Sequence, residues 1–551
     1  MQIFSDEKLG LRVARTDSGH HSGSNFAGNN VCHFSPGSRT QTWYATNMNS
    51  NQVFRTIDLF AGPGGLAEGF STCGTDGAQF KIALSVEKDP GAFRTLRLRS
   101  FFRNLDPADR DDYFRFANGG LSEDELIEMH PEAWAKAEEE TAMLELGNPE
   151  HDRELDKRLD ALLNDDADNF VVIGGPPCQA YSLAGRSRNA GNVEYVAEQD
   201  HRHFLFREYI RILEKVRPRA FVMENVKGIL SSSLSGDKVF ELVRRDLVNA
   251  AGRDSYELFS LSPDPGKAGF VLRAEEHGVP QARHRVILLG LRADVADCFA
   301  SSNACLKKAD QFVTVCEAIG DLPTLRSGLS REEDSFELWK ETVAAAFGIA
   351  AQAAPSGSKL HERLVAHRRK ILGLNDLRRS SKGYGDYPAS AYASGLRDSR
   401  LESPPNHETR GHMPSDLARY AFCSTFAEIE GRPPSSRDFP EALAPDHQSW
   451  ATGKFADRFK VQVGAKPSST ITSHISKDGH YFIHPDPTQC RSLTVREAAR
   501  LQSFPDDYIF LGNRTSQYVQ VGNAVPPLLA RQIANVLGGL LSKDNGQVKA
   551  A

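Results

Sequence analysis

The chain has 551 residues and a formal net charge of −6, with 40% hydrophobic and 25% charged residues. At about 100–200 residues per domain, this length is too great for one ordinary domain. The composition is typical of a soluble globular protein, and the lack of any apolar run of about 18 residues argues against a membrane span. A net acidic charge, taken over the whole chain, argues against binding to nucleic acid.

The eight cysteines are scattered along the chain and form no CxxC pair. This pattern argues against a disulfide framework or a metal site and favours a reducing cytosol. Residues 1–17 carry charges where a secretory signal needs an apolar core. We therefore expect a cytoplasmic protein without a metal or a membrane partner.

Residues 1–50 are rich in Ser, Gly, Asn and Thr and are predicted to form a flexible tail. Residues 51–300 alternate short apolar runs with helical stretches, which predicts an α/β domain with a doubly wound parallel sheet. The expected strands are Arg55–Phe60, Lys81–Val86, Phe170–Ile173, Ala220–Met223 and Arg285–Leu291.

Residues 101–170 differ from the rest of this domain, because they hold 21 acidic and 7 basic side chains. We interpret residues 101–168 as an acidic helical insertion that faces solvent or a partner, since such a segment is too acidic to lie along phosphates. The remainder of the chain is then net positive. The overall charge therefore does not exclude nucleic acid, because affinity depends on the contact face.

Residues 301–514 have few strand-like runs and are predicted to form a smaller, irregular domain. Within them, residues 361–400 hold nine Arg or Lys against four Asp or Glu. Such a stretch suits phosphate and major-groove contacts, although a solvated charged face is the alternative. The candidates are Arg368, Arg369, Arg378, Arg379 and Lys382. Residues 515–551 are expected to return to the first domain.

A glycine-rich loop, Ala61–Gly65, follows the first predicted strand and precedes a helix. Glycines at such a junction let the backbone approach a ligand, although a tight turn packed for its own sake is the alternative. Glu87 ends the next strand, 22 residues after Gly65, where a doubly wound sheet places the acid that binds ribose hydroxyls. This spacing predicts an adenosine cofactor and does not distinguish NAD from others.

Two further strand ends carry reactive groups. Cys178 follows a buried strand and two prolines, so it is either a nucleophile or a buried structural thiol. Glu224 follows the strand Ala220–Met223 and would share its crevice, as a general acid or as a helix-cap acid.

Gln281, Arg283 and Arg285 alternate along an extended segment, so we expect them to face one side. Two guanidinium groups on one face suit a phosphate or carbonyl oxygen. The alternative is an exposed surface pair.

In this order, the segments resemble the DNA (cytosine-5-)-methyltransferase family of the restriction–modification type. The matching segments are DLFAGPGG at 58–65, GGPPCQ at 174–179, ENV at 224–226, QARHR at 281–285, RSLTVREAARLQSFP at 491–505 and QVGNAVPP at 520–527. The resemblance implies a Rossmann-like methyltransferase sheet with a target-recognition domain at 301–514. It also implies S-adenosyl-L-methionine as cofactor and double-stranded DNA as partner, and leaves open a separate cognate restriction endonuclease.

The same resemblance implies roles for individual residues. Cys178 would add to C6 of a flipped-out cytosine, and Glu224 would hold or protonate N3. Arg283 and Arg285 would help to orient the base and the cysteine loop. The implied cofactor residues are Asp58, Phe60, Ala61, Gly62, Gly64, Gly65, Leu66, Glu87, Pro176, Asn523 and Val525. Further DNA contacts are expected from Gln179, Ser182 and Arg186.

The acid that would contact the cofactor adenine is not located by the sequence, with Asp165, Asp166 and Asp168 as candidates. A tRNA methyltransferase of the same fold, a catalytically silent DNA-binding regulator and an NAD-linked oxidoreductase are the alternatives. The large target region disfavours the first, and the intact Cys178 and Glu224 disfavour the second. The order of cysteine, glutamate and arginines has no role in the third. We expect a bacterial enzyme of the cytoplasm, held at the nucleoid by its DNA.

Overall fold

The computed structural model describes residues 52–74, 78–165, 168–177, 204–234, 237–264, 269–300, 304–381, 383–385, 388–445 and 458–548. Five predicted site residues lie outside these ranges: Cys178, Gln179, Ser182, Arg186 and Lys382. The predicted tail at 1–50 also lies outside them.

The described residues form a central eight-stranded sheet in the order β3–β2–β1–β4–β5–β11–β8, and β9 pairs with β11. The strands from β3 to β5 are parallel, whereas β11 runs antiparallel to both β5 and β8. The predicted α/β class with a doubly wound sheet is confirmed, with β11 as the reversed strand. Bounds are β1 (Gln52–Leu59), β2 (Ala78–Val86), β3 (Thr141–Ala142), β4 (Phe170–Gly174), β5 (Ala220–Val226), β8 (Tyr256–Phe259), β9 (Val271–Arg273) and β11 (His284–Arg292).

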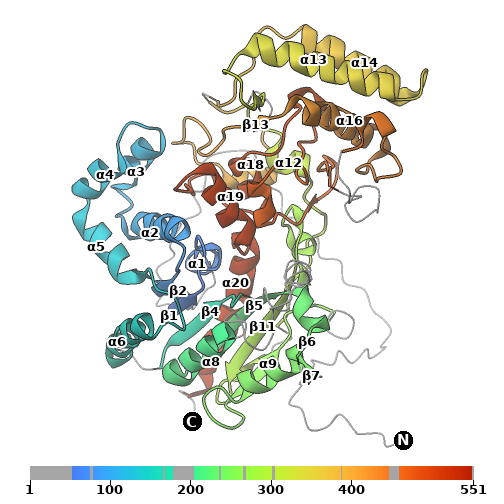
Figure 1. Cartoon of the computed structure of the whole chain (residues 1–551). Coiled ribbons are helices and arrows are strands. Elements are labelled where there is room, and N and C mark those ends of the chain that lie inside the picture. The colour runs from blue at the N-terminus through green and yellow to red at the C-terminus, as the bar shows by residue number, and fades with distance from the viewer. Residues whose placement is uncertain are drawn as a thin grey trace, which may run out of the picture.

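Helices cover both faces of the sheet (Figure 1). In β4, Val171 and Ile173 pack on one face while Phe170 and Val172 pack on the other, as the two-residue period of a strand requires. A strand buried on both faces reads as a continuous apolar run, which explains why it could be predicted. One face carries α1 (Gly65–Ser71) and α20 (Pro527–Val548); the other carries α6 (Pro149–Asp165), α8 (Phe204–Val216) and α9 (Val239–Val248).

Part of the expected acidic insertion belongs to the sheet domain itself. Strand β3 extends the sheet beside β2, and Leu155 and Leu159 of α6 are buried against it. The helices before β3 form a small cluster of their own, in which Tyr113 and Leu126 are buried. These helices are α2 (Pro90–Asn104), α3 (Arg110–Ala117), α4 (Glu123–Met129) and α5 (Pro131–Glu140). The high acid count concealed these buried positions.

The same helical cluster contacts the second domain. Arg400 Nη1 lies 3.3 Å from Asp111 Oδ1, and its guanidinium covers the ring of Phe114 at 3.9 Å. Leu401 completes the buried cluster. The segment therefore faces the second domain as well as solvent.

The second domain is more helical than expected, with a core formed largely by three helices. A helical hairpin of α13 (Phe336–Ala353) and α14 (Lys359–Leu372) lies at the far end of the molecule from the sheet, next to α16 (Pro414–Glu430) (Figure 1). Between them and the sheet are α12 (Val315–Ile319), α18 (Val495–Leu501) and α19 (Arg514–Asn523) (Figure 1). The short helix α15 (Ala391–Leu396) contacts α12. Short elements are β6 (Ser233–Leu234), β7 (Asp237–Lys238), β10 (Gln281–Ala282), α11 (Asp297–Ala300), β12 (Gly328–Leu329), β13 (Gly411–His412) and β14 (Ser468–Ser469).

The C-terminal helix α20 packs onto the sheet domain through Leu529, Ala530 and Ile533. A Cβ atom at Gly69 of α1 would lie 2.6 Å from the Pro527 carbonyl oxygen, so a glycine is needed for this approach. By length and composition the segment Arg514–Ser542 could cross a membrane, but 67% of its most apolar window is buried inside the protein. Its apolar character is accounted for by this packing.

Candidate active site

A cavity of about 450 Å³ lies at the carboxyl ends of the parallel strands, where such sheets bind their ligands. Its volume is within the usual range for a small-molecule site. The predicted residues that line it are Phe60, Ala61, Gly62, Leu66, Glu87, Pro176, Glu224, Arg283, Arg285, Asn523 and Val525. The fold thus brings together residues from both ends of the chain.

The loop after β1 has a backbone conformation that few residues adopt. Phe60, Gly62 and Gly64 have φ values of 57°, 58° and 99°. For Phe60 this left-handed conformation is costly, so the surrounding structure must hold it in place. A Cβ atom at Gly65 would lie 2.2 Å from the Val525 carbonyl oxygen. Gly64 and Gly65 therefore serve the packing beneath the loop, whereas Gly62 lines the cavity.

Glu87 fixes this loop from the end of β2. Its carboxylate accepts hydrogen bonds from the backbone N–H groups of Gly62 at 2.8 Å, Lys88 at 2.9 Å and Asp89 at 2.7 Å. Burial raises the pKa of Glu87, and these N–H groups oppose that effect. The carboxylate is held rigidly at the cavity wall, as a ribose-binding acid requires.

Asp58 lies beneath the loop and does not line the cavity, contrary to its expected role as a cofactor contact. The side chain is fully buried in β1, and burial raises its pKa to about 8. Its neighbours Ile57 and Leu59 pack on the face of the sheet that carries α6 and α8, so alternation turns Asp58 toward the face that carries α1.

The described part of the cysteine loop ends at Pro177, beside Glu224. A Cβ atom at Gly175 would lie 2.9 Å from Glu224 Oε2, and Asn225 Nδ2 donates a hydrogen bond to the Pro176 carbonyl oxygen at 3.3 Å. Asn225 thus holds the residues that lead into Cys178, and Glu224 lies close against Gly175. Cys178 itself lies outside the described residues.

The two arginines both face the cavity and have different partners. Arg285 Nε lies 2.7 Å from Glu224 Oε1. Arg283 Nη1 donates hydrogen bonds to the carbonyl oxygens of Ile471 at 2.9 Å and Gly522 at 3.2 Å, and its burial lowers the pKa of its guanidinium. Arg285 therefore orients the carboxylate, while Arg283 holds two distant wall segments together.

Gln281 does not line the cavity, although we expected it to share one side with Arg283 and Arg285. Its Oε1 accepts a hydrogen bond from the Ile471 N–H at 2.8 Å, and its Nε2 donates to the Leu501 carbonyl oxygen at 3.1 Å. Some residues of the cavity wall were not predicted, among them two leucines. Leu144 and Leu146, which follow β3, form an apolar part of the wall. The apolar spacing of these leucines was the available signal, and the acidity of the stretch obscured it.

The candidate adenine acids lie at the opposite edge of the sheet. Asp168 precedes β4 and lies 2.7 Å from Arg292, and Asp165 lies 3.7 Å from Arg55 near the start of β1. A cofactor at the carboxyl ends of the strands cannot reach them, so these two candidates are wrong. Asp166 lies outside the described residues.

The predicted DNA-contacting residues of the second domain have different surroundings. Arg368 and Arg369 are exposed on α14, and Arg378 has 62% of its side chain exposed. Arg379 is engaged within the fold, because its Nη2 donates to the Thr409 carbonyl oxygen at 2.9 Å and Asp334 lies 3.8 Å away. The first three are exposed, and Arg378 Nε lies 3.6 Å from Asp376 Oδ2, whereas Arg379 serves the fold.

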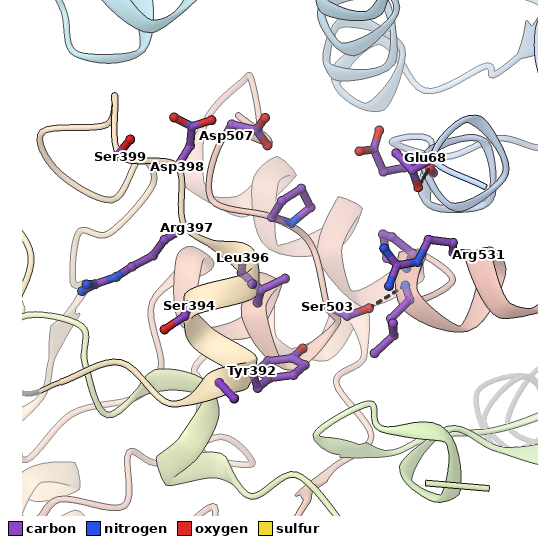
Figure 2. Close-up of a pocket in the computed structure, with 16 residues that line it drawn as sticks. Glu68, Tyr392, Ser394, Leu396, Arg397, Asp398, Ser399, Ser503, Asp507 and Arg531 are labelled. Carbon is purple, nitrogen blue, oxygen red and sulfur yellow. Dashed lines mark hydrogen bonds between the residues drawn. The ribbon is translucent and has the colours of Figure 1, made fainter. Parts of the chain in front are cut away.

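A second cavity, of about 600 Å³, lies between α1, α15, residues 503–507 and the start of α20. Figure 2 shows that Leu396 and Tyr392 lie along one side of it and Arg531 along the other. None of the predicted catalytic or cofactor residues lines it. The smaller cavity is therefore the candidate active site. In the described part of the chain, no group of three or more His, Cys, Asp or Glu side chains could hold a metal ion.

The fold and this site define the Rossmann-like class of S-adenosylmethionine-dependent methyltransferases. The sequence model of the C-5 cytosine-specific DNA methylase family matches residues 148–539. Type II methyltransferase M.Bpa9945I of Bacillus paralicheniformis is 34% identical over 504 residues, which cover 88% of this chain and 99% of that protein. M.AgeI of Thalassovita gelatinovora is 28% identical over 88% of this chain and 99% of its own, and M.DdeI of Desulfomicrobium norvegicum is 26% identical over 87% of each. The chain belongs to the C-5 cytosine-specific DNA methylase family and is a DNA (cytosine-5-)-methyltransferase.

Proposed function

We propose that the enzyme methylates C5 of a flipped-out cytosine in a specific double-stranded DNA sequence, through a covalent bond between Cys178 and C6. One observation carries this proposal. The Glu224 carboxylate, held by Arg285 at 2.7 Å, faces the residues that lead into Cys178, in the same cavity as the glycine loop and Glu87.

The cavity residues fit S-adenosyl-L-methionine. Glu87 offers a rigid carboxylate to the ribose hydroxyls, and Leu144 and Leu146 offer an apolar surface to the adenine. Gly62 leaves open space, because a Cβ atom built there would have no neighbour within 4 Å. Asn523 at the end of α19 and Val525 just after this helix would close the pocket. When bound, this cofactor supplies the methyl group from its sulfonium.

Cys178 would act on the cytosine ring before methyl transfer. Addition of its thiolate to C6 forms the S–C6 bond and moves the electron pair of the C5–C6 double bond toward C5 and N3. C5 thereby becomes nucleophilic and takes the methyl group. Loss of the C5 proton to a base then restores the double bond, and the S–C6 bond breaks to release the thiolate.

Glu224 would donate a proton to N3 as negative charge develops there during this addition, and would take it back when the S–C6 bond breaks. Its Oε1 is held by Arg285, so Oε2 is the atom available to the base. Arg285 is then a positioning residue for Glu224, and Arg283 is one for the cavity wall.

The target base lies inside a duplex, so it must rotate out of the stack to reach the cavity. Phosphate contacts would come from Arg368, Arg369 and Arg378, which are exposed. Gln179, Ser182, Arg186 and Lys382 are the further candidates for DNA contacts. We infer a role in restriction–modification, because M.Bpa9945I and M.DdeI are named type II methyltransferases. A separate cognate endonuclease would then cut the unmodified sequence, and the enzyme would act in the cytoplasm on nucleoid DNA.

The test is expression in a host that lacks cytosine methylation, followed by bisulfite sequencing of its DNA. We expect one cytosine of one short DNA sequence to be protected from bisulfite conversion. Cys178→Ala should abolish this protection while S-adenosylmethionine binding persists. Cys305→Ala is the matched control, because that cysteine is exposed and distant in sequence from the site. Unmodified DNA with methylated tRNA would favour the tRNA alternative, and sequence-specific DNA binding without methylation would favour a silent regulator.

A further inference from the structure

Four consecutive residues, Pro505–Tyr508, lie between α18 and α19 and contact both the cofactor loop and the second domain. Pro505 and Asp506 make contacts on the target side, whereas Asp507 and Tyr508 make contacts on the cofactor side. We infer that these residues couple the target region to the cofactor loop, with Tyr508 as a positioning residue for that loop. The inference rests on the proposed role of the loop in binding S-adenosylmethionine.

Tyr508 makes the contact on the cofactor side. Its buried hydroxyl donates a hydrogen bond to the Pro63 carbonyl oxygen, between the two left-handed glycines of the loop. A Cβ atom at Gly64 would lie 2.9 Å from this hydroxyl, so the glycine leaves room for it. Phe504 and Phe510 pack against the ring at 4.7 and 5.5 Å between centroids, which leaves the tyrosine no alternative position.

The loop needs support because its backbone is strained. Glu87, which lines the cavity, accepts the hydrogen bond of the Gly62 N–H, and Tyr508 donates one to the carbonyl oxygen of the following residue, Pro63. A strained backbone persists only where its surroundings over-determine it. Loss of either support would let the loop leave the conformation that shapes the cavity.

Asp506 and Pro505 make the contacts on the target side. Asp506 accepts hydrogen bonds from Arg500 at 2.9 and 2.7 Å and from the Tyr384 hydroxyl at 3.0 Å. The Asp506 N–H donates to the Leu396 carbonyl oxygen at 2.8 Å. Arg496 holds both ends of the segment, because it donates to the carbonyl oxygens of Pro505 at 2.9 Å and Tyr508 at 2.7 Å.

Asp507 ties the segment to the helices behind the loop. Arg99 Nη1 lies 3.3 Å from Asp507 Oδ1, and Arg99 also donates to both oxygens of Glu68 in α1, at 2.9 and 2.7 Å. Figure 2 shows Asp507 and Glu68 at the same end of the larger cavity. Because all four residues are held by buried or nearly buried contacts, the target region and the loop cannot move independently.

The first test measures S-adenosylmethionine affinity by calorimetry for the wild-type protein and for Tyr508→Phe. One neutral hydrogen bond is lost, so we expect the Kd to rise roughly two- to tenfold. The KM for the cofactor should rise in parallel, with kcat nearly unchanged at saturation. Tyr256→Phe is the matched control, because its hydroxyl also donates to a buried proline carbonyl, that of Pro218 at 2.9 Å. The control should lose similar thermal stability and keep the wild-type Kd.

The second test asks whether the target region contributes. Tyr384→Phe removes a hydrogen bond to Asp506 from a residue that does not line the cofactor cavity. We expect the cofactor Kd to rise less in Tyr384→Phe than in Tyr508→Phe. In the double variant, the Kd should rise by less than the product of the two single-variant rises. Tyr420→Phe is the control within the target region, where the hydroxyl contacts His480 at 2.9 Å.

A wild-type Kd in Tyr508→Phe would overturn the inference and leave the proposed function intact. The coupling between the target region and the loop would be overturned by a different result: Tyr508→Phe raises the Kd, Tyr384→Phe keeps the wild-type Kd, and the double variant shows independent effects. Failure of the wild-type protein to bind the cofactor would overturn the proposed function and the inference with it. Thermal melting of each variant identifies one that has not folded, and Tyr384→Phe then provides the test alone.

Discussion

Arg285 and Glu224 meet because β11 runs antiparallel to β5. Arg285 lies opposite Val226 in the register, so Glu224 is its diagonal neighbour on the same face, and the Nε–Oε1 distance is 2.7 Å. Diagonal pairs of this kind are within reach of long side chains. The one reversed strand thus supplies the cation that orients the candidate catalytic carboxylate.

Replacing Glu224 by Gln should lower kcat by about 10²-fold or more, because a positioned carboxylate that assists proton transfer contributes that much. The Kd for S-adenosylmethionine should stay close to that of the wild type. Tritiated methyl transfer to DNA measures kcat, and calorimetry measures the Kd. A variant with full kcat would remove Glu224 from the mechanism. Arg285→Met should lower kcat too, since it leaves a half-buried carboxylate without its cation.

Glu87→Ala should weaken cofactor binding by about 10- to 100-fold, because three hydrogen bonds to a charged group are lost together with the ribose contact. The methylated DNA sequence should not change. Titration with S-adenosylmethionine and bisulfite sequencing measure the two effects. Glu145→Ala is the control at the same edge of the sheet, where the carboxylate pairs with Lys88 at 3.0 Å. Equal affinities of the two variants would contradict the ribose role.

Gly65→Ala should destabilise the protein by about 1–3 kcal/mol, the usual cost of overpacking. The added methyl group would lie 2.2 Å from the Val525 carbonyl oxygen, which is backbone and cannot turn aside. Thermal unfolding checks this result. Gly74→Ala is the control, because a Cβ atom there has no neighbour within 4 Å. Equal melting temperatures would show that the contact between α1 and the C-terminal segment yields easily.

Asp58 should make stability depend on pH. Its pKa is about 8 in the folded protein and 3.8 ordinarily, so the folded state binds the proton more tightly. The stability contributed by this group is therefore present below about pH 4 and is lost as the pH rises toward 8.

Asp58→Asn removes this titration. Between pH 5 and 8, its free energy of unfolding should therefore rise relative to that of the wild type by about 1 kcal/mol or more. Melting temperatures at pH 5, 6.5 and 8 measure the difference. Asp376→Asn serves as the exposed control, with 66% of its side chain accessible. A constant difference between Asp58→Asn and the wild type across this range would contradict the shifted pKa.

Local pattern alone was enough to predict several features. The apolar runs of β1, β4 and β5 are buried on both faces of the sheet, and the spacing of Gly65 and Glu87 follows from one strand–helix–strand unit. Of the three residues that alternate along the predicted extended segment, Arg283 and Arg285 line the cavity and Gln281 does not. These features depend on residues close together in the chain, so periodicity and spacing carry them.

Only the tertiary structure could assign partners over long distances. Arg283 binds carbonyl oxygens 188 and 239 residues away, which makes it a brace for the cavity wall, whereas Arg285 binds Glu224. Asp58 belongs to the cofactor motif and yet lies beneath the loop. Strand β3 and helix α6 form from a stretch whose acidity concealed its apolar positions. The sequence determined the class of enzyme and its chemical groups, because motifs are local. The contacts that position those groups come from distant segments, and their selection depends on how the sheet and the second domain pack together.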